Sequence, residues 1–256
     1  MTIYVFIGKF FPKQTEIIAD KINELKSEYP NFDCKIIYDK QNQGIPESKI
    51  KEIEGSDNIA IVRGHGDINN DKHQIDLLKG GDKSSAKMMK LFKGKVKALF
   101  QFSCYGKKAA KDSQQIGNNA MHITYGDEKP TSRGMNTENI LFVLESLAQG
   151  KKIEQIIAEG VTKSPQTVTI TKNNIVKNSF FGFKYNTNQS KQISIQSSEF
   201  SQKSDVIKEN IKKTFNFFNS EIAEDQINNL INKSTKDRYR MNIIDICHKF
   251  YIRIFF

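Results

Sequence analysis

The chain has few cysteines and no long apolar run. Its 256 residues include only three cysteines, Cys34, Cys104 and Cys247. An odd number of irregularly spaced cysteines gives no disulfide framework, so we expect free thiols and a reducing compartment. No segment reaches the roughly 18 consecutive apolar residues that a membrane-spanning helix needs. Charged residues interrupt even the apolar segment at 242–256, and we therefore expect no transmembrane segment.

Several common site motifs are also absent. The sequence contains no GxxxxGK[ST] or GxGxxG motif for a nucleotide and no GxSxG motif for a serine hydrolase. Its histidines and cysteines lack the spacing of zinc ligands. Residues 67–71 (DINND) begin like a calcium loop, but Lys72 stands where that loop needs glycine and Leu78 where it needs glutamate. We therefore predict neither a bound metal nor a cofactor.

The charge balance and the N-terminus narrow the function further. The net charge is +10, which in many proteins indicates nucleic acid or an anionic surface as the partner. Here the excess is almost all lysine, spread along expected helices where lysines form solvated faces, so we do not expect nucleic acid as the main partner. Residues 1–8 (MTIYVFIG) lack the basic region of a signal peptide. We expect a cytoplasmic protein, or one delivered to a host cytosol without a cleavable signal peptide.

Short apolar segments alternate with amphipathic segments over the first two thirds of the chain. The pattern predicts strands at 3–8, 34–38, 58–64, 96–102 and 121–125. It predicts helices at 14–27, 46–54, 84–92, 107–116, 136–149 and 152–161, and a polar loop at 67–83. Strands that alternate with helices imply a mostly parallel sheet covered on both faces. We therefore predict an α/β three-layer sandwich.

The pattern changes after Pro165. Residues 166–195 alternate apolar and polar side chains and predict one or two β-hairpins, whereas residues 199–233 carry a helical apolar stripe. We therefore predict two domains. Residues 1–163 form the main domain, and residues 166–256 form a smaller C-terminal α+β subdomain.

The most informative residues follow two of the predicted strands. One apolar run, 58–64, leads into His65, and another, 96–102, leads into Ser103 and Cys104. If these strands are parallel neighbours, an imidazole and a thiol meet at one edge of the sheet, which is the minimum pair for a cysteine nucleophile. The histidine precedes the cysteine, the reverse of the papain order. A histidine in a turn and a buried structural cysteine fit the same residues.

These segments resemble a known family. IAIVRGHGD and ALFQFSCYG are similar to the two signature blocks of the caspase-like cysteine peptidases, the group of caspases, metacaspases, clostripain, gingipains, legumain and separase. MHITYGDEKPTSRG and the helix after it resemble the family's layout of strand, loop and long helix, so the likeness extends over about residues 1–163. The resemblance implies a caspase-like fold and a bacterial thiol endopeptidase. Its substrate would be a protein or peptide, cleaved through an acyl-thioester intermediate.

The resemblance also implies roles for single residues. His65 would be the general base and then the general acid, Cys104 the nucleophile, and the backbone amides of Gly66 and Cys104 the oxyanion hole. Many bacterial members bind a basic substrate residue with an acid, for which Asp127 and Glu128 are candidates, although both also fit an ordinary turn. Phe102 stands where metacaspases have such an acid. Some toxin-borne relatives are activated by inositol phosphate, so a polyanion is a candidate activator.

Two other interpretations stay open. The chain could be a caspase-like fold retained as a catalytically silent binding or regulatory module, in which Cys104 reacts no faster than the other thiols. It could also be an unrelated flavodoxin-like domain that binds a small phosphorylated ligand. In that fold His65 and Cys104 would lie too far apart to form a dyad, and Cys104→Ala would leave the function intact.

Overall fold

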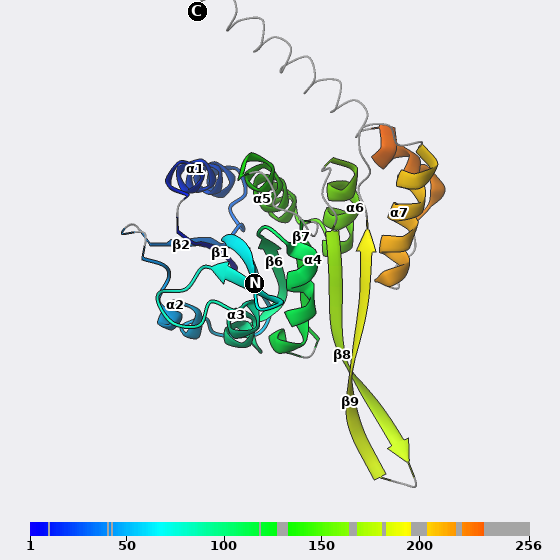
Figure 1. The fold of residues 1–256 in the computed structure, drawn as a ribbon. Coiled ribbons are helices and arrows are strands. Elements are labelled where there is room, and N and C mark those ends of the chain that lie inside the picture. Colours follow the sequence, from blue (N-terminus) through cyan, green and yellow to red (C-terminus); the bar gives the residue numbers. More distant parts are fainter. Residues whose placement is uncertain are drawn as a thin grey trace, which may run out of the picture. The chain divides into compact units, whose positions relative to one another are not determined.

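A computed structural model shows an α/β fold built on a mostly parallel seven-stranded sheet (Figure 1). It describes residues 1–9, 11–39, 41, 43–117, 119–126, 133–163, 168–180, 183–195, 204–218 and 222–232. The strands of the sheet are β1 (Ile3–Ile7), β2 (Cys34–Tyr38), β3 (Asn58–Arg63), β6 (Val96–Phe102), β7 (Met121–Tyr125), β8 (Val168–Phe180) and β9 (Phe183–Ile195). A separate two-stranded hairpin consists of β4 (His65–Asn69) and β5 (Lys72–Asp76).

Helices fill most of the connections. They are α1 (Pro12–Glu28), α2 (Glu47–Lys51), α3 (Ser85–Phe92), α4 (Gly106–Ala109), α5 (Arg133–Ala148), α6 (Ile153–Lys163) and α7 (Ser204–Phe217), with a 3₁₀ segment η1 (Ala110–Ile116). Residues 224–232 are also helical. The positions of the five strands predicted up to residue 125 are confirmed, and a hairpin lies within residues 166–195 as expected.

The strand order brings β3 and β6 together. It runs β2-β1-β3-β6-β7-β8-β9, and the strands from β2 to β7 pair in parallel, whereas β8 and β9 are antiparallel additions. The register aligns Arg63 with Phe102, and Phe102 with Tyr125. Because parallel strands end at the same edge, the segments that follow β3 and β6 leave the sheet side by side.

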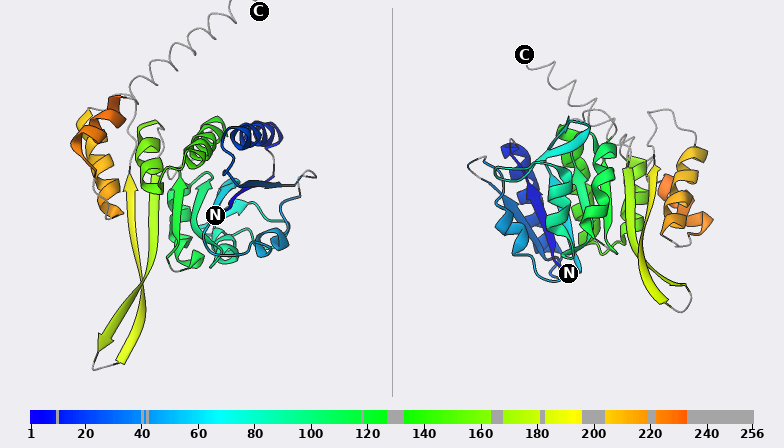
Figure 2. Two further views of the ribbon diagram at one scale, coloured as in Figure 1. Left: turned by 180° about the vertical axis from the view of Figure 1, so that it is seen from behind. Right: turned by 60° about the horizontal axis from the view of Figure 1, so that its bottom comes forward.

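Two helical layers cover the sheet (Figure 2). Helices α1 and α5 lie over one face, and α2 and α3 lie over the other. β3 is buried at every residue, as expected for a strand with both faces covered. The layer on the α3 side packs into one apolar cluster, which includes Phe6, Ile50, Val62, Met88, Met89, Phe92 and Leu99. The predicted α/β three-layer arrangement is therefore confirmed.

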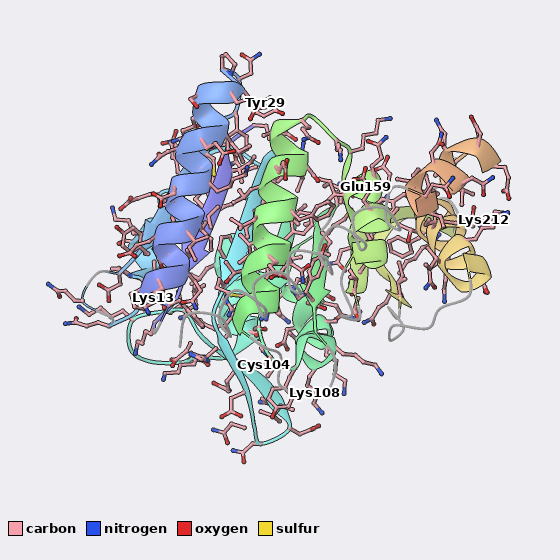
Figure 3. The ribbon with its side chains drawn as sticks, turned by 90° about the horizontal axis from the view of Figure 1, so that it is seen from above. Lys13, Tyr29, Cys104, Lys108, Glu159 and Lys212 are labelled. Carbon is pink, nitrogen blue, oxygen red and sulfur yellow. The ribbon has the colours of Figure 1, made fainter. Side chains whose placement is uncertain are left out.

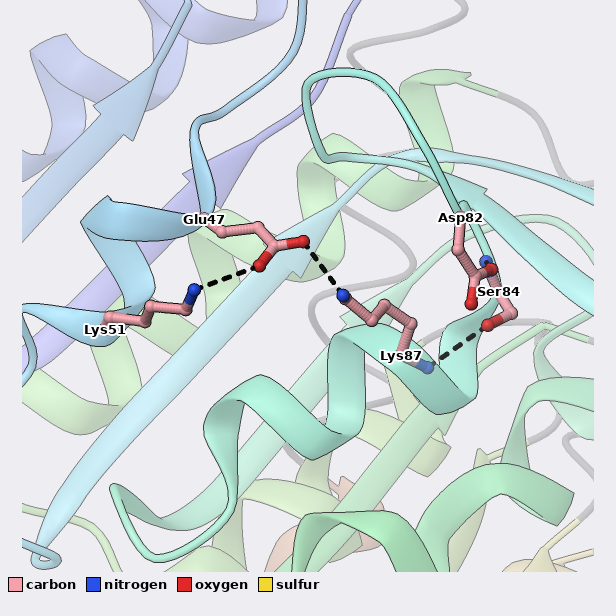
Figure 4. Close-up of polar contacts among 5 residues, drawn as sticks. All are labelled: Glu47, Lys51, Asp82, Ser84 and Lys87. Carbon is pink, nitrogen blue, oxygen red and sulfur yellow. Dashed lines mark hydrogen bonds and ion pairs between the residues drawn. The ribbon is translucent and has the colours of Figure 1, made fainter.

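Polar contacts fix the start of α3 and join it to α2 (Figure 4). The Ser84 hydroxyl accepts a hydrogen bond of 3.2 Å from the backbone N–H of Lys87 and so caps the helix. Asp82 in turn accepts a hydrogen bond of 2.8 Å from the Ser84 N–H. On the other side, Glu47 of α2 forms ion pairs with Lys51 and Lys87. These contacts define where α3 begins and link it to α2.

Two local predictions were wrong. The segment predicted as a loop at 67–83 contains the β4–β5 hairpin, because Asn70 and Asp71 both adopt left-handed backbone angles and form a tight two-residue turn. The helix predicted at 107–116 is a short α-helix followed by the 3₁₀ segment η1.

The described chain divides into two compact units. The described residues of one unit lie within 1–151 and 166–195, and those of the other lie within 152–165 and 196–256. This division differs from the boundary predicted at 163–166, because β8 hydrogen-bonds to β7 and carries the hairpin into the main sheet. The second unit has its own apolar cluster, formed by Ala158, Ile207, Ile211, Phe215 and Ile227. No helix in the described parts of the chain is both long and apolar enough to cross a membrane.

Candidate active site

Cys104 lies just beyond the carboxyl end of β6. It is partly exposed, whereas Cys34 in β2 is fully buried. Burial raises the pKa of Cys34 to about 12, despite the opposing charge of Lys26. Figure 3 places Cys104 at the same edge of the sheet as Lys13 at the start of α1, and far from Tyr29 at the other end of that helix. Of the two described thiols, only Cys104 can meet a ligand from solvent.

The segment that follows β3 runs directly against Cys104. The Gly64 N–H donates a hydrogen bond of 3.3 Å to the carbonyl oxygen of Phe102 and extends the pairing of β3 with β6. Beyond it, a methyl group placed on Gly66 would lie 2.2 Å from the carbonyl oxygen of Cys104 and 2.9 Å from its backbone nitrogen. Only glycine permits so close a backbone approach. The structure therefore brings His65-Gly66 and Cys104 together at one edge.

An aromatic contact orients the ring of His65. The imidazole stacks on the ring of Phe11, with centroids 4.6 Å apart and an angle of 26° between the planes. Phe11 is buried just before α1, so its position is fixed by the helix that follows. The guanidinium carbon of Arg63 lies 4.3 Å from the centroid of the same ring. The ring of Phe11 thus contacts both the imidazole of His65 and the guanidinium of Arg63.

The backbone after Cys104 is sharply bent. Tyr105 has φ 58° and ψ 37°, a left-handed conformation that is unfavourable for a bulky residue. Gly106 follows, and a methyl group there would lie 2.5 Å from the carbonyl oxygen of Tyr125. The chain therefore turns abruptly from β6 into α4 while pressed against the end of β7. Such strain persists only where the surroundings enforce it, and it concentrates at functional sites.

A second histidine, which the sequence analysis did not single out as functional, contacts Cys104 directly. His73 lies on β5 and is buried, with its Nε2 2.9 Å from the carbonyl oxygen of Cys104. Its Nδ1 lies 2.5 Å from the hydroxyl oxygen of Ser85, the first residue of α3. Burial lowers the pKa of His73, and this effect outweighs the Cys104 carbonyl and Asp67, which raise it. His73 is therefore neutral near pH 7.

Further polar groups continue from His73 into the sheet. The Ser103 hydroxyl lies 3.5 Å from His73 Nε2 and accepts a hydrogen bond of 3.0 Å from the side-chain amide of Gln101. The oxygen of that amide lies 2.9 Å from Nε2 of His122. Burial lowers the pKa of His122 to about 3, with a smaller contribution from His73. Neutral His122 therefore donates a hydrogen bond to the side-chain oxygen of Gln101. The buried polar side chains thus form a series from His122 through Gln101 to Ser103, the residue before Cys104.

The other predicted site residues and any metal site remain without support. Asp127 and Glu128 lie outside the described residues. Within the described residues, no group of three or more His, Cys, Asp or Glu side chains could hold a metal ion. The sequence did carry one signal for His73, since it lies two residues before the apolar Ile75 and so shares a strand face with it, after a short Asn-Asp turn.

Comparisons with known proteins add no family assignment. No protein-family model and no curated protein sequence matches this chain.

Proposed function

We propose that the chain is a caspase-like cysteine endopeptidase in which His65 and Cys104 form the catalytic dyad. The observation that carries this proposal is the contact between the Gly66 backbone and the Cys104 backbone at the carboxyl edge of the parallel pair β3 and β6. An accessible thiol and an imidazole then leave the sheet side by side, as nucleophilic catalysis requires. A flavodoxin-like domain with the two residues far apart fits this geometry poorly.

The chemistry follows from the residues at the site. His65 takes the proton of the Cys104 thiol, and the thiolate attacks the carbonyl carbon of a peptide bond. The resulting oxyanion accepts hydrogen bonds from the backbone amides of Gly66 and Cys104, an interaction worth about 10²–10³ in rate. His65 returns its proton to the leaving amine, and water then hydrolyses the thioester. The substrate is a protein or peptide. Asp127 and Glu128 are proposed to bind a basic substrate residue before the cleaved bond.

The first test uses thiol-directed peptide probes. The pure chain is incubated under reducing conditions with peptidyl acyloxymethyl ketones carrying Arg, Lys, Asp, Asn or Leu before the reactive group. Adducts are mapped by mass spectrometry. We expect an adduct on Cys104 with at least one probe, and we expect His65→Ala to slow its formation by about 10²–10⁴-fold. The probe that reacts fastest reports the preference of the substrate pocket.

Controls for this test come from the same chain. Cys34 is buried and has a raised pKa, so it should stay unlabelled in every sample. Parallel samples contain inositol phosphate, because a polyanion is a candidate activator, and a further set contains calcium. No Cys104 adduct in any sample of folded protein would favour the catalytically silent binding module instead.

A further inference from the structure

The direction of the Cys104 carbonyl oxygen matters for the proposed reaction, and neither His65 nor the Cys104 thiol fixes that direction. A carbonyl oxygen carries partial negative charge and would repel the oxyanion that forms on the substrate. In this structure the oxygen is directed toward the hairpin side, where it meets His73 at 2.9 Å. The backbone bends sharply at Tyr105, whose own carbonyl oxygen accepts hydrogen bonds from the N–H groups of Lys108 and Ala109 at the start of α4. The contact with His73 holds the Cys104 carbonyl in the direction away from the proposed oxyanion hole.

The hydrogen-bond directions at His73 are fixed by its two partners. A carbonyl oxygen can only accept, so the neutral ring must carry its proton on Nε2 and donate to Cys104. Nδ1 then accepts from the hydroxyl of Ser85, which is fully buried at the start of α3. One contact orients the ring and the other orients the peptide. Because α3 is capped at Ser84 and packed in the core, Ser85 is a rigid support.

His73 cannot itself be the general base. It is 2% exposed, and its Nε2 faces the Cys104 backbone. It also lies against Gly66, since a methyl group on that glycine would lie 2.9 Å from Nε2. His73 therefore contacts both backbone segments whose amides would bind the oxyanion. We propose that His73, held by Ser85, is a positioning residue that fixes the Cys104 peptide and so shapes the oxyanion hole. This inference rests on the proposed peptidase function.

The test separates acyl chemistry from simple thiol reactivity. A peptide aldehyde with the sequence of the best ketone probe forms a thiohemiacetal and needs the oxyanion hole, whereas iodoacetamide alkylates the thiolate without forming an oxyanion. We expect His73→Leu to weaken aldehyde binding about tenfold to a hundredfold, with an alkylation rate of Cys104 within about threefold of wild type. His73→Gln keeps an N–H donor and should recover part of the affinity. By contrast, His65→Ala should lower both reactions.

Ile50→Val is the matched control for lost stability, because Ile50 is buried in the apolar cluster against which α3 packs but belongs to α2. It should leave both reactions unchanged. The inference is overturned if His73→Leu binds the aldehyde as wild type does, or if it loses alkylation and aldehyde binding equally. Failure of the proposed function is a separate result, in which the wild-type chain gives no Cys104 adduct, and it removes the inference as well.

A measurement without turnover tests the hydrogen-bond directions. Nitrogen NMR of ¹⁵N-histidine-labelled wild-type protein at pH 7, assigned with His73→Gln, reports which ring nitrogen carries the proton. We expect His73 to be protonated on Nε2 alone. Protonation on Nδ1, or on both nitrogens, would contradict the proposed role even in an active enzyme.

Discussion

At the candidate site, the atoms around a residue limit which side chain can stand there. Gly66 faces the backbone of Cys104 and the ring of His73 at distances that leave no room for a methyl group. By contrast, a methyl group on Gly80 would meet nothing within 4 Å, although the φ of 67° at that position favours glycine. Two glycines on adjacent stretches of one chain thus serve different purposes, close contact at the first and a turn at the second.

This contrast predicts the effect of adding one methyl group. Gly66→Ala should lower the rate of Cys104 labelling by the peptidyl ketone by about 10²-fold, because a shift of about 1 Å in the site is enough to do so. Gly80→Ala should cost only about 1–2 kcal/mol of stability, from backbone strain, and should keep the labelling rate. The measurements are labelling kinetics and thermal unfolding of both variants. A wild-type labelling rate in Gly66→Ala would show that the two backbones are not in tight contact.

The residues of the candidate site differed in how far the sequence revealed them. Order and spacing were enough to single out His65 and Cys104, because each follows a strand-length apolar run. His73 was missed because its role depends on a tertiary contact with a carbonyl oxygen, which no local pattern encodes. Phe11 was missed for the same reason, since its ring meets His65 only after α1 docks on the sheet.

At the level of elements, the β4–β5 hairpin is the part that the sequence analysis described worst. Its strands have five residues each, and β4 is exposed over its last three residues, so the apolar alternation that marks a strand is weak. Its turn consists of Asn70 and Asp71, both at positive φ, and lacks the Asn-Gly pair that signals such turns most clearly. The hairpin is nevertheless tied to the site by His73 and by an ion pair between Asp71 and Lys108 of α4.

Two substitutions at Asp71 distinguish the effect of its left-handed backbone on stability from the effect of its charge. Asp71→Gly and Asp71→Val both remove the ion pair with Lys108, in which the Asp71 side chain is exposed. Only the β-branched valine also opposes the left-handed turn, so Asp71→Val should be less stable than Asp71→Gly by about 1–2 kcal/mol. Urea unfolding of the two variants measures this difference. Equal stability would mean that the turn is not held in the left-handed conformation.

For the whole molecule, the architecture was easier to predict than its division into units. Alternating strands and helices were enough to predict the parallel sheet, because that pattern has few packing solutions. The position of the β8–β9 hairpin in the sheet could not be predicted from the sequence pattern. Alternating apolar and polar residues indicate a strand with one buried face, but they do not show which strand it pairs with. Its pairing with β7 was therefore not foreseen.

The stability of the whole chain should depend on His122. The pKa of this histidine is about 3 in the folded state, below the usual value of 6.5, so the unfolded chain binds more protons between these values. Its contribution to stability is complete above about pH 6.5 and is lost as the pH falls toward 3. From pH 7 to pH 4.5 this loss amounts to about 2–3 kcal/mol.

The comparison variant is His122→Phe, which keeps a planar ring and removes the titrating group. It leaves Gln101 without its donor and should be less stable than wild type at pH 7. We expect the gap between the two proteins to narrow or reverse at pH 4.5, as followed by chemical unfolding at both pH values. A constant gap would mean that His122 is not buried in its neutral form.

The parallel pairing of β3 with β6 has a consequence for how the protein is made. The ribosome releases the histidine first, and the thiol follows only after the hairpin and α3 have been synthesised. A parallel pair cannot close as a local turn and needs the whole crossover between its strands. A nascent chain therefore carries one half of the site for some time without the other. Under the proposed function, the chain gains peptidase activity only after it has folded, so a nascent chain does not cleave itself.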